Sequence, residues 1–247
     1  MYEAVLLGES KIMERVREQI ATLAALPWHV RIEGPSGSGK ALAARVLHLL
    51  SARARRPFVV CSLAMLPDGI EISELVGHRR GAFTGAVEDR AGAFERAHTG
   101  TLFLNEVGTA SNRAQQALLQ LVDEGAFQRL GEERVRTVDV RLLFATNEEL
   151  EARVAGGTFR EDLYQRLGML VLRMPALAEH PEDIPELTDH LLSVKSRQAG
   201  VSVTPLTAGD MQRLMSYGWP GSVRQLDRAM EHYVAFGRLP DTIDRGV

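Results

Sequence analysis

Several features that often fix a protein's class are missing from this sequence. It contains one cysteine, Cys61, so no disulfide can form within the chain. No apolar run approaches the roughly 20 residues that a membrane-spanning helix needs. Residues 1–10 lack the charged and then apolar pattern of a signal peptide. These absences suit a reducing compartment, and we expect a cytoplasmic protein with no membrane partner.

An excess of charge of one sign is missing as well. The 29 lysine and arginine residues face 32 aspartate and glutamate residues, which leaves a formal net charge of −3. Binding of DNA without regard to sequence depends on basic side chains that neutralise phosphates, so this balance argues against that class of protein. The short basic run at 53–56 is interpreted as a solvated loop. Cys61 lies in the apolar run 58–61 and is interpreted as a core residue rather than a nucleophile.

The sequence does contain short apolar segments that alternate with helical patterns. Hydrophobic residues make up 45% of the 247 residues, enough for one large domain or two modest ones. Strands are expected at 29–32, 58–61, 101–104 and 140–145. Helices are expected at 10–26, with Ser10 as its cap and Pro27 at its end, at 40–50 and at 114–123. The alternation predicts an α/β fold in which helices cover a parallel sheet.

The character of the chain changes at about residue 174. Pro181, Pro185 and Pro205 interrupt helical segments there, and no strand pattern is strong. We therefore expect two domains: an α/β nucleotide-binding domain at 1–173 and a small all-α domain at 174–247.

A glycine-rich turn follows the first expected strand and precedes a helix. It fits the pattern G-x-x-x-x-G-K with the residues Gly34, Pro35, Ser36, Gly37, Ser38, Gly39 and Lys40. Such glycines let backbone N–H groups surround phosphate oxygens, while the helix dipole and the lysine ammonium add positive charge. A turn that merely precedes a helix is the alternative, and the order strand, turn, helix favours a nucleotide site. Ala41 stands where many such loops carry a hydroxyl residue that ligates magnesium.

Two polar residues end the expected strand at 101–104. Asn105 and Glu106 follow its apolar residues and emerge at the carboxyl end, the edge of a parallel sheet where ligands bind. Glu106 is the candidate for polarising an attacking water. Asn105 is the candidate neighbour of Mg²⁺.

The segment between these two motifs has the composition of a flexible glycine and alanine loop. It consists of Gly81, Ala82, Phe83, Thr84, Gly85 and Ala86. This GAFTGA sequence, with residues 73–78 before it, resembles the sigma-54 contact loop of the bacterial sigma-54-dependent transcriptional activators, also called enhancer-binding proteins. The resemblance extends from about Val5 to about Tyr233 and includes residues 145–147, 159–167 and 219–226.

The resemblance implies a P-loop NTPase of the AAA+ class with a helical lid, which binds ATP and Mg²⁺ and hydrolyses ATP to ADP and phosphate. It implies self-association into a ring, with a hexamer as the expected size, and contact between the loop at 81–86 and sigma-54 RNA polymerase. It also implies that Asn147 and Arg224 sense the terminal phosphate. Arg160 and Arg166 would act as arginine fingers on the nucleotide of a neighbouring subunit.

Elementary geometry is compatible with these roles. Arg160 and Arg166 are six positions apart, which is about 240° around a helix, so they point in different directions. Pairing with Glu161 or Asp162 on the surface is the alternative for at least one of them. The run 222–225 predicts a capping box, in which Ser222 and Gln225 fix the first turn and aim Arg224.

Three positions depart from the family pattern. Asn105 replaces the usual aspartate, Ser62 replaces an asparagine that restrains the catalytic glutamate, and Ala41 stands where the family usually has glutamate. Magnesium prefers carboxylate oxygen, so the first change weakens its site. Asn105 is either natural divergence or an introduced substitution, and the change at Ser62 favours divergence.

Alternatives to an active ATPase therefore remain open. One is a nucleotide-gated regulatory or interaction module without turnover. Another is a AAA+ motor that acts on a different target, against which the intact GAFTGA sequence argues. Only 14 residues follow Tyr233, so no DNA-binding module is expected within this chain.

Overall fold

The computed structural model describes residues 6–63, 70–147 and 149–244. Contacts divide the described chain into two compact units. We call residues 20–33 and 43–172 the sheet unit. The lid unit comprises the described residues up to 19, residues 34–42, and the chain from 173 onward.

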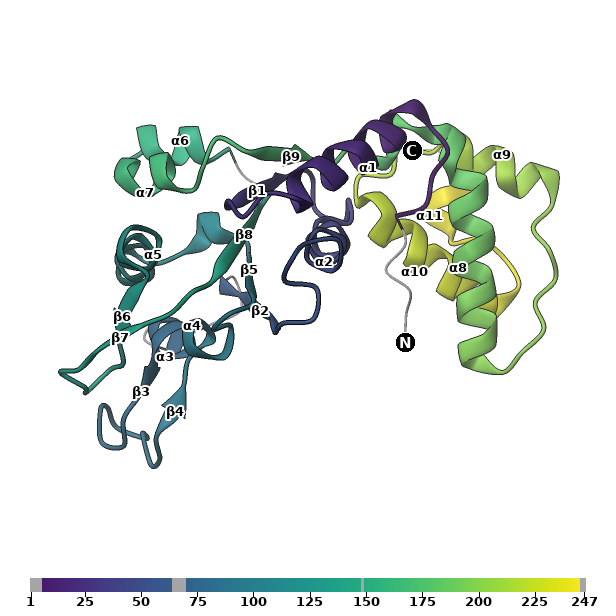
Figure 1. The fold of residues 1–247 in the computed structure, drawn as a ribbon. Helices are drawn as coiled ribbons and strands as arrows, with labels where there is room; N and C mark the ends of the chain where they lie inside the picture. The colour runs from purple at the N-terminus through teal and green to yellow at the C-terminus, as the bar shows by residue number, and fades with distance from the viewer. Residues whose placement is uncertain (1–5, 64–69, 148, 245–247) are drawn as a thin grey trace. The chain divides into compact units, whose positions relative to one another are not determined.

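The sheet unit is built on a five-stranded sheet with the order β2-β5-β8-β1-β9 (Figure 1). Its strands are β1 (Val30–Glu33), β2 (Phe58–Ser62), β5 (Thr101–Asn105), β8 (Arg141–Thr146) and β9 (Val171–Arg173). The pairs β2–β5, β5–β8 and β8–β1 are parallel. The two central strands are buried nearly throughout, which explains their continuous apolar sequences. The expected α/β fold is confirmed, and β9 was not expected.

The helices that lie wholly in the sheet unit are α3 (Ile70–Val76), α4 (Ala93–Arg96), α5 (Asn112–Glu124), α6 (Leu150–Ala155) and α7 (Glu161–Arg166), with a 3-10 turn η2 (Val107–Thr109), and their apolar residues contribute to its hydrophobic core. Two further helices, α1 (Lys11–Ala24) and α2 (Lys40–Leu49), begin in the lid unit and end in the sheet unit. The Ser111 hydroxyl accepts the Ala114 N–H and starts α5, while Gly125 ends it in the left-handed conformation. Cys61 is buried in this core as expected, and burial raises the pKa of its thiol to about 11.

The ends of α1 are stabilised by different groups. At its start, the Ser10 hydroxyl accepts the Met13 N–H at 3.2 Å, as the sequence predicted. The helix ends at Ala24, before Pro27, and the buried guanidinium of Arg141 donates to the carbonyl oxygens of the last turn. A cation at the C-terminus of a helix complements its dipole, so Arg141 fixes this end of the helix.

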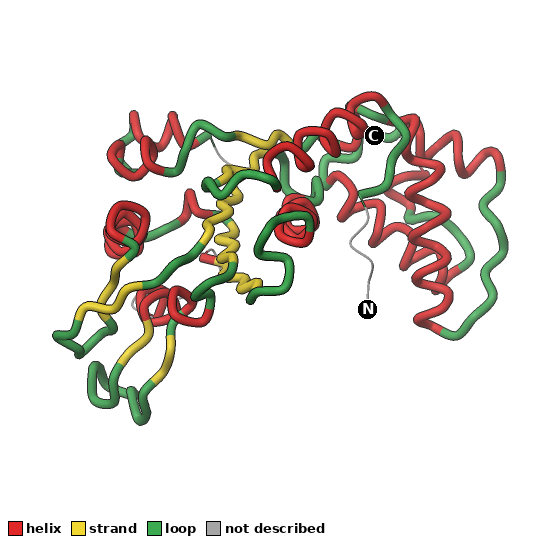
Figure 2. The backbone as a smooth tube through the Cα atoms, viewed as in Figure 1, coloured by secondary structure: helices red, strands yellow, loops and turns green. Residues whose placement is uncertain are grey.

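Two small antiparallel hairpins extend from the sheet unit, and the sequence patterns did not predict them. One pairs β3 (Gly77–His78) with β4 (Arg90–Ala91), and the other pairs β6 (Ala126–Gln128) with β7 (Val135–Thr137). His78 and Leu130 form a bridge between the two hairpins. The backbone trace in Figure 2 shows that the loops of both hairpins project from the same end of this unit.

The lid unit contains the C-terminal helices, and within the described residues it has no strand after β9. These are α8 (Ile184–Ala199), α9 (Ala208–Ser216), α10 (Ser222–Phe236) and α11 (Asp241–Asp244), preceded by 3-10 turns η3 (Leu177–Glu179) and η4 (Pro181–Asp183). Helices α8 and α10 lie side by side (Figure 1) and enclose a core that includes Trp219, Leu226 and Met230. The expected helical character of this region is confirmed.

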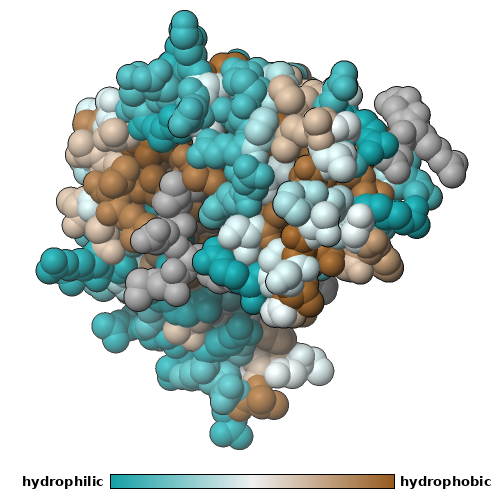
Figure 3. All heavy atoms as spheres, turned by 90° about the vertical axis from the view of Figure 1, so that its right-hand side faces the viewer, coloured by the Kyte–Doolittle hydropathy of each residue, from teal (hydrophilic) through white to brown (hydrophobic). Residues whose placement is uncertain are grey.

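Hydrophilic residues cover much of the face shown in Figure 3, and hydrophobic residues reach the surface in patches. Among the described residues, no helix combines the length and hydrophobicity required to cross a bilayer.

The predicted capping box at the start of α10 is wrong. The N-cap is Gly221, whose N–H donates to the Gln225 side chain at 2.9 Å. Ser222 has a left-handed backbone, with φ at 51°, and its hydroxyl accepts the Leu177 N–H at 3.1 Å. The serine side chain therefore joins α10 to η3 instead of capping its own helix, a tertiary contact that the local sequence does not reveal.

Candidate nucleotide site

The glycine-rich loop belongs to the lid unit, and its backbone requires glycine. Gly34, Gly37 and Gly39 have φ values of 145°, 83° and 93°. A Cβ at Gly37 would lie 2.2 Å from the Gly221 carbonyl oxygen, and one at Gly34 would lie 2.4 Å from the Met174 carbonyl oxygen. The loop therefore needs these glycines both for its left-handed turns and for its close approach to lid backbone.

Buried polar groups line this loop. The ammonium of Lys40, which is 6% exposed, donates to the carbonyl oxygens of Gly34 at 2.7 Å and Pro35 at 3.1 Å. The Ser38 hydroxyl is buried and has no hydrogen-bond partner among the described residues. A buried polar atom without a partner is unfavourable unless a ligand supplies one. Because α2 also starts at Lys40 with its positive end, the loop fits a polyanionic ligand.

Arg224 lies at the same loop. Its guanidinium donates to the Ser36 hydroxyl at 3.0 Å, and its backbone N–H donates to the Gly37 carbonyl oxygen at 3.3 Å. Both contacts come from the first turn of α10, so the lid places a cation beside the loop. Arg224 therefore lies beside the phosphate loop, and the sequence analysis had proposed both as parts of one nucleotide site.

A second group of polar residues lies at the carboxyl edge of the sheet, in the sheet unit. Ser62, Asn105 and Ala145 are in register across β2, β5 and β8. Glu106 follows directly, and its carboxylate accepts the Asn147 backbone N–H at 3.3 Å. The structure therefore brings together Asn105, Glu106 and Asn147, all of which the sequence analysis selected.

The backbone of Glu106 is unusual. Its φ of 58° and ψ of 50° place it in the left-handed region, which is uncommon for residues other than glycine. Such conformations cost about 1 kcal/mol or more and cluster at functional sites. The left-handed turn ends β5 abruptly and leads into η2.

The described residues offer little to a metal ion. They contain no group of three histidine, cysteine, aspartate or glutamate residues placed to hold one. Asn105 supplies a neutral carbonyl oxygen, and Ala41 has no side-chain oxygen. A metal beside Asn105 would therefore need the neighbouring Glu106 carboxylate or oxygens that come with a ligand.

Arg160 and Arg166 lie at opposite ends of α7. Arg160 precedes the helix and pairs with Asp162 at 2.7 Å, while Arg166 ends it and pairs with Asp123 at 3.0 Å. Their side chains are 45% and 62% exposed. Exposed pairs of this kind contribute little to stability, so either guanidinium can exchange its partner readily.

The GAFTGA segment forms the loop of the β3–β4 hairpin. Its ends meet through a hydrogen bond from the Gly81 N–H to the Ala86 carbonyl oxygen at 2.8 Å. Phe83 is 41% exposed, and its ring meets the edge of the His78 ring at 5.0 Å between centroids. A Cβ at Gly131, in the β6–β7 turn, would lie 2.8 Å from the Ala82 Cβ, so the two hairpin loops touch.

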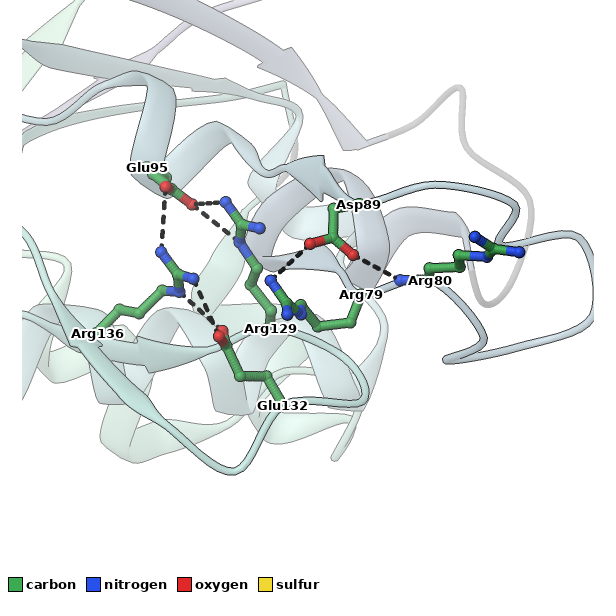
Figure 4. Close-up of polar contacts among 7 residues, drawn as sticks. All are labelled: Arg79, Arg80, Asp89, Glu95, Arg129, Glu132 and Arg136. Carbon is green, nitrogen blue, oxygen red and sulfur yellow. Dashed lines mark hydrogen bonds and ion pairs between the residues drawn. The ribbon is translucent and has the colours of Figure 1, made fainter.

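Ion pairs hold both hairpins in place (Figure 4). Glu95 of α4 pairs with Arg129 at 2.5 Å and with Arg136 at 3.3 Å, and Arg136 also pairs with Glu132 at 2.7 Å. At the base of the GAFTGA loop, Asp89 pairs with Arg79 at 2.5 Å. None of these ion pairs was expected from the sequence: Glu95 pairs with residues 34 and 41 positions away, whereas the Arg136–Glu132 and Arg79–Asp89 pairs are local.

The phosphate loop between a parallel strand and a helix, the acidic residue that follows β5 and the helical lid define a nucleotide-binding protein of the P-loop class. Residues 6–173 match the Sigma-54 interaction domain, and residues 178–244 match the AAA+ ATPase lid domain. The chain therefore belongs to the sigma-54 interaction domain family, as the resemblance at 81–86 and in the neighbouring motifs predicted.

Curated relatives include transcriptional regulators. The chain is 46% identical over 232 residues to the Nif-specific regulatory protein of Azotobacter vinelandii, with 93% of this chain and 44% of the relative covered. It is 42% identical over 246 residues to the C4-dicarboxylate transport transcriptional regulatory protein of Pseudomonas aeruginosa, covering 97% and 53%. The chain thus spans about half the length of these relatives.

A solved structure of NtrX from Brucella abortus in complex with ATP is also similar, with a TM-score of 0.91 and 34% identity, covering 98% of this chain and 55% of the other. The same protein in complex with ADP gives a TM-score of 0.89 at 35% identity, with 94% and 52% covered.

Proposed function

We propose that this chain is the ATP-hydrolysing AAA+ domain of a sigma-54-dependent transcriptional activator, in which ATP binding and hydrolysis drive remodelling of sigma-54 RNA polymerase. The left-handed Glu106 at the end of β5, with its carboxylate held by the Asn147 N–H, is the observation that supports hydrolysis most directly. Family membership supports the rest.

In this proposal each site residue has a distinct role. Backbone N–H groups of residues 36–39 and the Lys40 ammonium hold the phosphates, with the Ser38 hydroxyl as a further donor. Glu106 polarises the attacking water, and Arg224 stabilises charge at the terminal phosphate. Asn105 would help to hold a magnesium ion bound to the triphosphate, and that ion would supply positive charge that neutralises the phosphates.

The neighbouring subunit completes the site in this proposal. Arg160 and Arg166 would reach the nucleotide of the next subunit in a ring, with the hexamer as the expected size. The proposal places this activity in the cytoplasm, where the polymerase is found. Residues 1–173 and 174–247 are proposed as the nucleotide-binding domain and the lid domain.

Calorimetry and phosphate release test the enzymatic part. We expect ATP to bind to the wild-type chain, and we expect Lys40→Ala to weaken binding at least tenfold because it removes the charge that faces the outer phosphates. Wild-type protein should release phosphate from ATP, and Glu106→Gln should bind ATP but release none. Binding without any phosphate release would instead support the nucleotide-gated module without turnover.

A binding assay with purified sigma-54 and a phosphoryl-transition-state mimic tests the partner. Phe83→Ala should lose sigma-54 binding and keep ATP binding, because the exposed Phe83 ring lies in the GAFTGA loop. Val87→Ala is the matched control, since Val87 is 78% exposed but lies outside the motif. Equal sigma-54 binding by wild type and Phe83→Ala would refute the assigned contact.

A further inference from the structure

Arg31 is a charged residue in the middle of β1, and only 7% of it is exposed. A buried guanidinium is stable only when other groups compensate its charge. The Arg31 Nε lies 2.8 Å from Glu33 Oε1, a charge contact in which the Nε–H makes no hydrogen bond, and its Nη2 lies 3.5 Å from Glu151 Oε1. The guanidinium carbon also stands 5.1 Å from the centroid of the Tyr164 ring, within range of a cation–π interaction.

These partners come from three different elements. Glu33 ends β1, Glu151 lies in α6, and Tyr164 lies in α7. The Tyr164 hydroxyl also donates to the Glu151 oxygen that faces Arg31. This hydrogen bond lowers the pKa of Glu151 and raises the pKa of Tyr164, so the carboxylate stays charged toward both partners.

The α7 helix needs such support. It has six residues, too few to be stable alone, and Leu163 is its one buried residue. The ion pairs of Arg160 and Arg166 are exposed and cannot hold the helix firmly. By contrast, the cluster of Arg31, Glu151 and Tyr164 contains a buried cation, while its Glu151 side chain is 56% exposed. Removing the partners of a buried cation is destabilising because its charge is then uncompensated.

We propose that Arg31 is a positioning residue: it holds α7, and therefore Arg160 and Arg166, against the strand that leads into the phosphate loop. Glu33, which Arg31 also binds, immediately precedes Gly34. The cluster thus joins the helix that carries the arginines to the residue before the phosphate loop. The functional part of this inference rests on the proposed ATPase function.

Hydrogen exchange measures the positioning directly. In Arg31→Leu, amides 161–166 should exchange at least tenfold faster than in wild type. Tyr164→Phe keeps the ring and removes only the hydrogen bond to Glu151, so it should fold normally and give a smaller increase. Arg238→Leu removes an exposed pair with Asp241 in the lid unit and should leave α7 unchanged. If amides 161–166 exchanged at the wild-type rate in both Arg31→Leu and Tyr164→Phe, the proposal would be overturned.

Turnover in mixed assemblies connects this positioning to the arginines. Arg31→Leu should lower kcat about tenfold with little change in KM. Arg31→Lys should retain more of the wild-type kcat than Arg31→Leu but not all of it, because lysine lacks the planar guanidinium. Adding Lys40→Ala subunits, whose α7 is intact, should raise turnover by Arg31→Leu subunits, because the added arginines reach across the interface.

The control mixture contains Lys40→Ala and Arg166→Ala subunits. If this control regains turnover and the Arg31→Leu mixture does not, Arg31 does not act through the arginines and the proposal is overturned. A wild-type chain without turnover would refute the proposed ATPase function instead. The exchange rates of 161–166 would then still decide whether Arg31 positions α7.

Discussion

Asn105 is a neutral residue at the end of β5, where a carboxylate would bind a cation by charge as well as by geometry. Asn105→Asp should therefore raise ATP turnover with a much smaller effect on ATP affinity. Losing one electrostatic stabiliser typically costs roughly 10²–10³ in rate, which sets the scale of the expected gain. Phosphate release under saturating ATP measures it.

Asn112→Asp is the matched control for this change. It makes the same substitution at the exposed first residue of α5, and turnover should not change. An ordinary wild-type rate that Asn105→Asp leaves unaltered would show that Glu106 and water suffice without a carboxylate at 105.

His29 makes the stability of the protein depend on pH. Burial, with nearby Arg141 and Arg53, lowers the pKa of His29 to about 4, and its Nδ1 accepts the Leu142 N–H. In the unfolded chain the His29 imidazole is protonated at about pH 6.5, whereas in the folded chain it is protonated only at about pH 4. The contribution of His29 to the free energy of unfolding should therefore be fully present above pH 6.5. It should be lost as the pH falls to about 4, and the loss should be at most about 3 kcal/mol.

Denaturant unfolding between pH 7.5 and 4 checks this expectation. His29→Asn keeps a side-chain acceptor for the Leu142 N–H but cannot be protonated, so its stability should depend less on pH than that of wild type. Identical pH profiles for the two proteins would contradict the assignment to His29.

At the residue scale, the sequence selected candidate side chains but not their conformations. The glycines at 34, 37 and 39 were expected to let backbone N–H groups surround phosphates, and the structure adds that they form left-handed turns, which glycine adopts without strain. Nothing local to Glu106 indicates that a glutamate adopts one. Ser222 was assigned to a cap from its neighbours, whereas its hydroxyl bonds a residue far away in the sequence.

At the scale of elements, ion pairs connect the β6–β7 hairpin to its surroundings. Arg136 pairs with Glu95 on one side and Glu132 on the other, which joins β7 to α4 and to its own turn (Figure 4). Arg136→Met keeps most of the side-chain length and removes the charge. Amides 135–137 should then exchange faster, and sigma-54 affinity should fall about threefold while ATP binding stays the same.

Arg134→Met is the control within the same turn, since Arg134 is exposed. Raising the salt concentration should reduce the difference between wild type and Arg136→Met, because salt screens partly exposed pairs. A difference that persists unchanged in high salt would argue for a packing effect rather than an electrostatic one.

The strands that could be predicted from sequence have apolar runs, and they include β2, a partly exposed edge strand. Strands β1, β5 and β8 lie inside the sheet and have apolar runs that stand out, so their positions were predicted within one or two residues. Strand β9 and the strands of both hairpins have only two or three residues each, too few to give a clear pattern. Arg31 and Glu33 were visible as charged residues two apart on one strand face, a signal that local pattern analysis passed over.

At the scale of the whole molecule, the proposed ring shares each active site between two subunits. Lys40→Ala subunits should not bind ATP, and Arg166→Ala subunits should bind it without efficient turnover. Mixing them should yield more phosphate release than the sum of the separate samples, because some interfaces combine an intact loop with an intact arginine. Turnover that only averages the two samples would indicate that the arginine does not act on a neighbour.

The membership of the phosphate loop in the lid unit limits how this protein can be recombined with its relatives. Gly34 and Gly37 touch the backbone at Met174 and Gly221 so closely that neither segment tolerates a shifted counterpart. A chimera with a single junction near residue 173 would combine the phosphate loop of one protein with the lid helices of another. Exchange of residues 34–42 together with the C-terminal helices should give the more stable hybrids, so recombination is expected to preserve these two segments as an inherited pair.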